Sequence, residues 1–301
     1  MVQSSKLVWI RKKETNMGDQ FQGRVPVNKI IPFSAVDGPG NRTAVFVQGC
    51  NFNCRYCHNP ETRSLCRSCG ECVEKCPKQA LYIENGKVLF HPELCCGCDT
   101  CIKTCRFDAS PRIRYMNAQE VYQEICRQVP FIRGITVSGG ECTLYPEFLQ
   151  ELFTLCKKDG LGTLADSNGT LDFSKYPKLL AQMDGVMLDI KAWSEKDHLA
   201  VTDQPNDLVI RNMKYLAEQG KLYEVRTVVV PGLFDCEETV CQVAALAARY
   251  LEKGDIRYKI IKYRPMGVRS EYAHYQVPEQ ELMEHLAKRA RECGMKTVLV
   301  V

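Results

Sequence analysis

Two periods of apolar residues alternate along most of this chain. Short apolar runs of strand length lie at 43–47, 134–138, 162–165, 186–190, 224–230 and 258–263. Apolar residues recur with the helical period at 146–158, 173–182, 207–218, 237–252 and 278–293. This succession of strands and helices predicts an α/β protein built from βα units, with crossover helices between parallel strands.

The segment 146–158 shows the signals of one predicted helix clearly. Pro146 stands at its start, apolar residues such as Phe148, Leu152 and Leu155 repeat along one face, and Gly160 follows its end. Six βα units of this kind are expected to close into a full or partial barrel, with 297–301 as a final strand or tail. In such a barrel the functional site lies at the carboxyl ends of the strands.

Polar residues stand where several of these strands end. They are Ser138-Gly139-Gly140-Glu141, Asp166-Ser167-Asn168-Gly169, Asp189 with Lys191, and Arg226. Two adjacent glycines let backbone approach a ligand closely, and a charged residue in an apolar strand is seldom there for packing alone. The alternative is a set of structural ion pairs among Glu141, Asp189, Lys191 and Arg226.

Three cysteines directly follow the first predicted strand. Cys50, Cys54 and Cys57 have the spacing C-x3-C-x2-C. A [4Fe-4S] cluster has four irons, so three thiolates hold it and leave one iron open for another ligand. The open iron indicates catalysis at this cluster.

Eight further cysteines form two identical runs of spacing C-x2-C-x2-C-x3-C. The first contains Cys66, Cys69, Cys72 and Cys76, and the second contains Cys95, Cys98, Cys101 and Cys105. In the two-cluster ferredoxin pattern the fourth cysteine of each run ligates the other cluster. One predicted cluster therefore uses Cys66, Cys69, Cys72 and Cys105, and the other uses Cys95, Cys98, Cys101 and Cys76.

Zinc and disulfides are the alternatives for a cysteine-rich segment. Zinc also accepts C-x2-C pairs, but a duplicated run of four is not its usual pattern. A disulfide framework is typical of short secreted chains, and this chain is long and lacks a secretory start. The other seven cysteines are interpreted as small buried hydrophobic residues: Cys96, Cys126, Cys142, Cys156, Cys236, Cys241 and Cys293.

Composition agrees with a globular enzyme. The chain has 301 residues, of which 45% are hydrophobic, enough for a barrel-sized unit and a smaller one. The formal net charge of +4 is spread along the chain, so neither a nucleic-acid footprint nor a membrane span is expected. Residues 1–23 are interpreted as a loose N-terminal extension, 24–61 and 113–301 as the barrel, and 62–112 as an insertion.

The motifs together resemble the radical S-adenosylmethionine (SAM) superfamily. The resemblance lies in the loop from Cys50 to Cys57, with Tyr56 before its last cysteine, and in the Gly139-Gly140-Glu141 turn. Two segments narrow the resemblance to the glycyl-radical-enzyme activating enzymes, which include pyruvate formate-lyase activase. They are Val36-Asp37-Gly38-Pro39-Gly40-Asn41-Arg42 and Cys57-His58-Asn59-Pro60-Glu61-Thr62. Residues 138–141, 166–169, 187–193 and 218–222 are most similar to the YjjW type.

The resemblance implies a fold and a reaction. The fold is a partial (β/α)6 radical SAM barrel with an inserted bacterial-type 2[4Fe-4S] ferredoxin domain. The SAM amine and carboxylate chelate the iron that Cys50, Cys54 and Cys57 leave open. The reduced cluster then cleaves SAM to methionine and a 5′-deoxyadenosyl radical, which abstracts the Cα hydrogen of a glycine in a partner enzyme.

The resemblance also implies roles for individual residues. Gly139, Gly140 and Glu141 would bind the methionine amino group, with Glu141 as the charge match, and the backbone of Tyr56 would reach the adenine. Asn59, Lys191 and Arg226 are expected contacts to the ribose or carboxylate. A monovalent cation would be held by Asp166, Ser167, Met187 and Asp189.

Further expectations concern partners. The segment Asp37 to Arg42, including Gly38, would grip the partner loop, although Asp, Gly and Pro also form ordinary turns. Arg264 stands where many activases have a histidine, so it either replaces that contact or leaves it empty. The inserted clusters would relay electrons from a flavodoxin or ferredoxin, or else dock the partner or brace the fold. A cytoplasmic, anaerobic setting is expected.

Two other functions stay open at the level of sequence. A radical SAM enzyme acting on a small molecule would share the open cluster and Glu141, but it would have less need of the Asp37 to Arg42 segment. A non-catalytic iron-sulfur electron carrier would explain residues 66–105 and leave the barrel unexplained.

Overall fold

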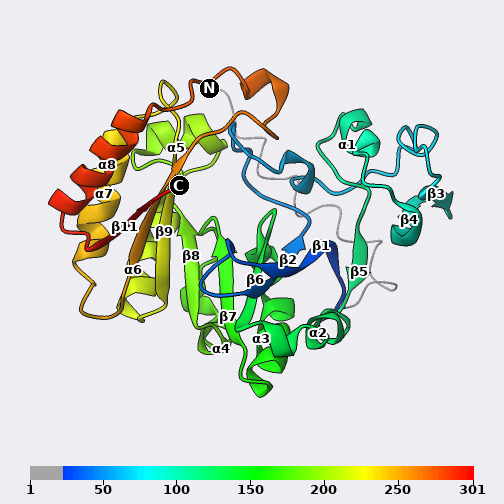
Figure 1. The fold of residues 1–301 in the computed structure, drawn as a ribbon, viewed down its shortest axis with the longest axis horizontal. Coiled ribbons are helices and arrows are strands. Elements are labelled where there is room, and N and C mark those ends of the chain that lie inside the picture. Colours follow the sequence, from blue (N-terminus) through cyan, green and yellow to red (C-terminus); the bar gives the residue numbers. More distant parts are fainter. Residues whose placement is uncertain (1–22) are drawn as a thin grey trace, which may run out of the picture.

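The computed structural model describes residues 23–301, and the predicted N-terminal extension lies almost wholly outside the described residues. A nine-stranded sheet dominates the structure, with strand order β11-β10-β9-β8-β7-β6-β2-β1-β5. Figure 1 shows this sheet strongly curved, with helices along its outer side. Its two edge strands, β11 and β5, do not pair with each other, so the sheet is an open barrel wall.

Seven of the nine strands are parallel. They are β2 (Arg42–Val47), β6 (Gly134–Gly139), β7 (Gly162–Ser167), β8 (Gly185–Asp189), β9 (Leu222–Val229), β10 (Arg257–Lys262) and β11 (Thr297–Val300). The six strands predicted from apolar runs are therefore present, and the predicted tail is the strand β11. The α/β fold with a parallel sheet is confirmed.

The remaining two strands of the main sheet were not predicted. β1 (Val25–Ser34) pairs antiparallel with β2, and β5 (Arg114–Met116) pairs antiparallel with β1. Only part of β1 is buried, and β5 is three residues long. Neither strand has a clear apolar period. β1 pairs with the next strand along the chain, β2, whereas β5 pairs only with the distant β1.

Helices cover the sheet between successive strands. They are α2 (Ala118–Cys126), α3 (Pro146–Lys158), α4 (Pro177–Gln182), α5 (Glu195–Thr202), α6 (Asp207–Glu218), α7 (Cys236–Ala248) and α8 (Gln280–Glu292). The predicted bounds of α3 and α6 are confirmed to the residue. Leu149, Leu152 and Phe153 of α3 are fully buried against the sheet, as the helical period requires. None of the helices in residues 23–301 has both the length and the hydrophobicity to cross a membrane.

Residues 62–112 lie to one side of the sheet in Figure 1. They contain the hairpin of β3 (Leu81–Glu84) and β4 (Lys87–Phe90) and the short helix α1 (Thr100–Thr104). A separate small hydrophobic cluster of Cys72, Leu81, Val88 and Cys101 supports them.

Short 3-10 turns lie between several of the helices and strands: η1 (Pro60–Thr62), η2 (Pro92–Leu94), η3 (Val129–Phe131), η4 (Cys142–Leu144), η5 (Phe173–Lys175) and η6 (Ser270–Tyr272).

Candidate functional site

A cavity of about 210 Å³ lies at the carboxyl ends of the central strands. Most of the predicted site residues line it together: Cys50, Cys54, Tyr56, Cys57, Asn59, Ser138, Gly139, Gly140, Glu141, Asp166, Ser167, Asp189, Lys191 and Arg226. Sequence reasoning missed Phe52, His58, Asn168, Val228 and Ile261 in its wall. His58 lies in the segment from Cys57 to Thr62, and Asn168 lies in the polar stretch 166–169. Val228 and Ile261 have no such signal, because their sequence is that of ordinary strand residues.

The loop that carries Cys50, Cys54 and Cys57 is fixed by backbone hydrogen bonds on two sides. The Cys50 N–H donates to the carbonyl of Arg63 at 2.9 Å. The N–H groups of Asn53 and Arg55 donate to the last carbonyls of α5, both at 3.0 Å. These contacts satisfy backbone groups that a loop would otherwise leave to water, so the loop is held in one place.

The three thiols are in a protected environment. Burial raises the pKa of Cys50 to about 12 and of Cys54 to about 12, and it also raises the pKa of Cys57. The thiolate form therefore needs a positive partner such as iron. The Phe52 N–H donates to the Cys50 sulfur at 3.4 Å, a contact typical of cluster ligands. The donor set thus fits an iron-sulfur cluster.

The turn at Gly139 and Gly140 packs directly on this loop. The Gly140 N–H donates to the carbonyl of Val47 at 2.9 Å, and the Glu141 N–H donates to the carbonyl of Gly49 at 2.7 Å. A Cβ on Gly140 would lie 2.1 Å from the Gly49 oxygen, and one on Gly139 would lie 2.2 Å from the Val47 oxygen. Glycine is required here because two backbone segments are in contact.

The Glu141 carboxylate is satisfied by the chain itself. It accepts hydrogen bonds from the N–H of Thr143, the hydroxyls of Thr143 and Ser167, and the N–H of Asn168 at 2.6 Å. The side chain is 1% exposed, and burial raises its pKa. The oxygens of Glu141 join the turn after β6 to Ser167 and Asn168. Its expected role as the charge match for the SAM amino group stays a prediction.

Arg226 is the centre of a buried ion-pair network. Its guanidinium contacts Asp166 at 3.0 Å and Glu224 at 2.6 Å, and it donates to the sulfur of Met187 at 2.8 Å. Glu224 is fully buried and also pairs with Arg257 and Lys259. Burial alone would lower the pKa of Arg226, but the nearby carboxylates outweigh it and raise the pKa.

Lys191 forms the second ion pair of the cavity. Its ammonium lies 2.7 Å from Asp189 and 5.8 Å from the centre of the Tyr56 ring. Burial would lower the pKa of Lys191, but the charge of Asp189 outweighs it and raises the pKa. The structural ion pairs that the sequence left open as an alternative are thus present. Lys191 pairs with Asp189, and Arg226 pairs with Asp166 and Glu224 and not with Glu141.

Two predicted partner-binding residues, Asp37 and Gly38, lie between β1 and β2, and the third, Arg42, is the first residue of β2. Asp37 accepts a hydrogen bond from the Ser34 hydroxyl, and Gly38 lines a large cavity described below. Arg42 is 3% exposed and donates to Thr136 and to the carbonyls of Ile135 and Gly162. Its guanidinium is thus used inside the fold, and the expectation that Arg42 grips a partner stays a prediction.

A larger cavity of about 760 Å³ adjoins the first and shares His58, Arg226 and Ile261 with it. The side chain of Arg264 lines this larger cavity and not the smaller one. The ring of His58 instead donates to the backbone carbonyl of Arg264 at 2.9 Å, with the hydrogen on Nε2. Whether Arg264 replaces the contact of the usual histidine or leaves it empty stays a prediction.

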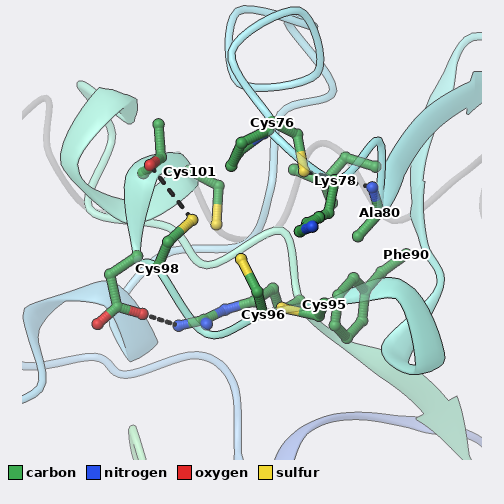
Figure 2. A pocket seen from close by; sticks show the side chains of 13 residues that line it. Cys76, Lys78, Ala80, Phe90, Cys95, Cys96, Cys98 and Cys101 are labelled. Carbon is green, nitrogen blue, oxygen red and sulfur yellow. Dashed lines mark hydrogen bonds and ion pairs between the residues drawn. The ribbon is translucent and has the colours of Figure 1, made fainter.

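The eight cysteines of the two repeated runs line two further cavities. Cys66, Cys69, Cys72 and Cys105 line one, and Cys76, Cys95, Cys98 and Cys101 line the other, which Figure 2 shows. These are the two crossed sets that the spacing predicts. Among residues 23–301, no three cysteine, histidine or carboxylate side chains converge on a single metal-ion position.

The two cavities are built by an internal structural repeat of 29 positions. Left-handed backbone occurs at Ser68 and Gly97, at Gly70 and Asp99, and at Gln79 and Asp108. The N–H groups of Ser68 and Gly97 each donate to the first cysteine sulfur of their run at 3.4 Å. The repeat seen in the cysteine spacing is therefore also a repeat of backbone conformation.

Comparison with known proteins agrees with this site. The model of the radical SAM superfamily matches residues 44–244. A putative glycyl-radical enzyme activating enzyme of Haemophilus influenzae is 31% identical, over 92% of this chain and 97% of its own length. The pyruvate formate-lyase-activating enzyme of Streptococcus mutans is 32% identical over 80% of this chain and 78% of its own length.

A solved structure extends the likeness of fold. SuiB of Streptococcus suis, bound to the precursor peptide SuiA, aligns with a TM-score of 0.56 and 14% identity, over 84% of this chain and 47% of that chain. The family match, the relatives and the three-cysteine cavity agree. This chain therefore belongs to the radical SAM superfamily, whose members use SAM and a [4Fe-4S] cluster, and within it to the glycyl-radical-enzyme activating enzymes.

Proposed function

We propose that this protein installs a radical on one glycine of a partner glycyl radical enzyme, which is its protein substrate. The observation that carries the proposal is the cavity where Cys50, Cys54 and Cys57 meet the Gly139-Gly140 turn. The adjoining cavity of about 760 Å³ gives a polypeptide segment room to approach. Bound there, a [4Fe-4S] cluster and SAM supply one-electron cleavage of SAM to methionine and a 5′-deoxyadenosyl radical, which removes the Cα hydrogen of the glycine.

The chain's own residues would hold and orient these groups. The thiols of Cys50, Cys54 and Cys57 would ligate three irons of a bound cluster and would leave the fourth for SAM. Backbone groups at Gly139, Gly140 and Tyr56 contact the methionine and adenine ends. Glu141 positions the Gly139-Gly140 turn through its own hydrogen bonds.

The polar side chains of the cavity complete the proposed SAM site. Asn59, Lys191 and Arg226 supply polar contacts to the ribose and carboxylate. Lys191 and Arg226 keep their charge because buried carboxylates pair with them.

The alkali-cation site stays a prediction. Asp166 and Asp189 already pair with Arg226 and Lys191, and the Ser167 hydroxyl donates to Glu141. A cation bound there with SAM would have to displace these contacts. Comparison of SAM affinity in potassium and in tetramethylammonium salts at equal ionic strength checks it.

We further propose that residues 62–112 are a ferredoxin-like domain with two [4Fe-4S] clusters, inserted into a barrel of residues 24–61 and 113–301. The two sets of four cysteines around separate cavities support this division. A flavodoxin or ferredoxin is the proposed electron donor, in an anaerobic cytoplasm. The similar stretches at 138–141, 166–169 and 187–193 favour the YjjW type of activase.

An anaerobic electron paramagnetic resonance (EPR) experiment tests the function. The reconstituted, reduced protein is incubated with SAM and a candidate partner, and 5′-deoxyadenosine is measured in the same tube. A glycyl doublet that disappears when the partner's glycine is replaced is the expected result. Deoxyadenosine without a doublet from any candidate glycyl radical enzyme would count against a protein substrate.

A further inference from the structure

The cavity at Cys76, Cys95, Cys98 and Cys101 contains a fifth cysteine. Cys96 also lines it, and in Figure 2 its side chain lies between those of Cys98 and Cys95. A [4Fe-4S] cluster needs only four thiolates. One more thiol is thus present than the predicted cluster uses.

Cys96 and Cys98 line the same cavity, and their side chains are neighbours in Figure 2. The Cys98 sulfur lies 3.3 Å from the Thr100 hydroxyl. Both Cys96 and Cys98 are exposed, whereas Cys101 is buried. The iron held by Cys98 would be at the solvent side of the cluster, where a ligand is most easily exchanged.

The internal repeat shows what is particular to Cys96. In the other cavity the position after the first cysteine is Arg67, whose guanidinium lies 4.4 Å from the centre of the Phe107 ring. The backbone conformation is the same in both loops, as the paired left-handed residues Ser68 and Gly97 show. At this equivalent position, one cavity therefore has a spare thiol and the other has an arginine.

We propose that Cys96 is a reserve ligand of this inserted cluster, able to take over the iron that Cys98 binds. The inference rests on the two inserted clusters of the proposed function. In the exchange the iron-sulfur bond to Cys98 breaks and one to Cys96 forms. The Cys96 thiol gives its proton to solvent, the freed Cys98 thiolate takes one up, and no electron is transferred.

Cysteine variants of the full chain test the proposal, with iron and acid-labile sulfide per chain and the EPR of the reduced protein as readouts. Wild type with three clusters holds about 12 irons. Cys98→Ala should keep about 12 irons, because Cys96 replaces the lost ligand, and Cys96→Ala should also keep them. The double variant Cys96→Ala/Cys98→Ala should fall to about 8 irons.

The matched control is Cys69→Ala, the equivalent position in the cavity without a spare thiol. Cys69 is exposed like Cys98, so this variant should lose its cluster and hold about 8 irons. Cleavage of SAM with dithionite shows in every variant that the barrel is folded and its cluster intact.

Three results would overturn the proposal. One is a Cys98→Ala variant that loses as much iron as the double variant. Another is a double variant that keeps the cluster. The third is a three-iron cluster in oxidised Cys98→Ala, seen by EPR. If wild type holds only about 4 irons, the two inserted clusters are absent and the inference loses its basis. SAM cleavage would then still test the activase function separately.

Discussion

At the scale of single residues, Glu141 shows how a motif carboxylate can act through the fold. Its two oxygens accept from Thr143, Ser167 and Asn168, which belong to two different loops of the cavity wall. In Glu141→Gln an amide N–H₂ replaces one oxygen and faces donors. We expect a loss of about 1–3 kcal/mol in the free energy of unfolding, together with weaker SAM binding.

Urea unfolding and equilibrium SAM binding check this expectation. Glu151→Gln is the control, since Glu151 is exposed on α3, and it should change stability by less than about 0.5 kcal/mol. If Glu141→Gln unfolds like wild type and loses SAM affinity alone, Glu141 contacts SAM directly and the structural interpretation is wrong.

Gly140 gives a steric prediction at the same scale. In Gly140→Ala the new Cβ would lie 2.1 Å from the Gly49 oxygen, so the cysteine loop or the turn must move. Overpacking of this kind costs about 1–3 kcal/mol. We expect lower stability and incomplete occupancy of the cluster at Cys50, Cys54 and Cys57, measured by thermal unfolding and iron content.

The matched control is Gly254→Ala, where a Cβ meets nothing within 4 Å. Equal iron content and melting temperature in the two variants would show that the close backbone contact at Gly140 does not limit cluster binding.

At the scale of elements, α5 supports the cysteine loop and carries a buried histidine. The carbonyls of Val201 and Thr202 accept from the loop, and the fully buried His198 packs edge-on against Phe52 at 5.3 Å. Its Nδ1 lies 2.7 Å from the Gln204 carbonyl. The cysteine loop therefore depends on the packing of this short helix.

His198 makes this support dependent on pH. Burial lowers its pKa below the usual 6.5, so the folded state binds its proton less readily than the unfolded state. The contribution to stability is present above pH 6.5 and is lost as the pH falls below it towards the lowered pKa. The urea concentration at the midpoint of unfolding should be lower at about pH 5.5 than at about pH 7.5, and His198→Gln should make this difference smaller.

His274→Gln is the control for this experiment, because His274 is exposed. The same pH dependence in wild type and His198→Gln would assign the effect to other groups.

At the scale of the whole molecule, the segment 62–112 begins directly beside the first cysteine of the site. The Cys50 N–H donates to the Arg63 carbonyl at 2.9 Å, and the Gly49 N–H donates to the Thr62 carbonyl at 2.8 Å. Arg63 is three positions before Cys66. The start of the segment 62–112 is thus hydrogen bonded to the loop that carries Cys50.

The relay predicts a difference between electron donors. In Cys66→Ser/Cys69→Ser, SAM cleavage should persist with dithionite, which reaches the barrel cluster directly, and drop at least about tenfold with reduced flavodoxin, a difference of about 1.4 kcal/mol or more in activation free energy. Formation of 5′-deoxyadenosine is the measurement. Unchanged turnover with flavodoxin would leave docking or bracing as the role of the insertion.

Local patterns were sufficient for much of this protein. Apolar periods predicted α3, α6 and the six parallel strands, because burial on one face leaves a repeat in adjacent residues. The cysteine spacing predicted two sets of four that line separate cavities. The residues of the main cavity were found because parallel strands bring their carboxyl ends to one edge of the sheet.

Only the tertiary structure decided which polar groups meet. Arg42 donates to Gly162, 120 positions away, and Arg226 contacts Asp166, so no local pattern reveals either pair. The antiparallel strand β5 exists through such distant pairing with β1, and the hydrogen bonds of the Glu141 carboxylate likewise join distant segments. The sequence determined the elements and the chemistry available to them, since these depend on neighbours in the chain. The fold decided which groups remain available to a ligand, because that depends on contacts between distant segments.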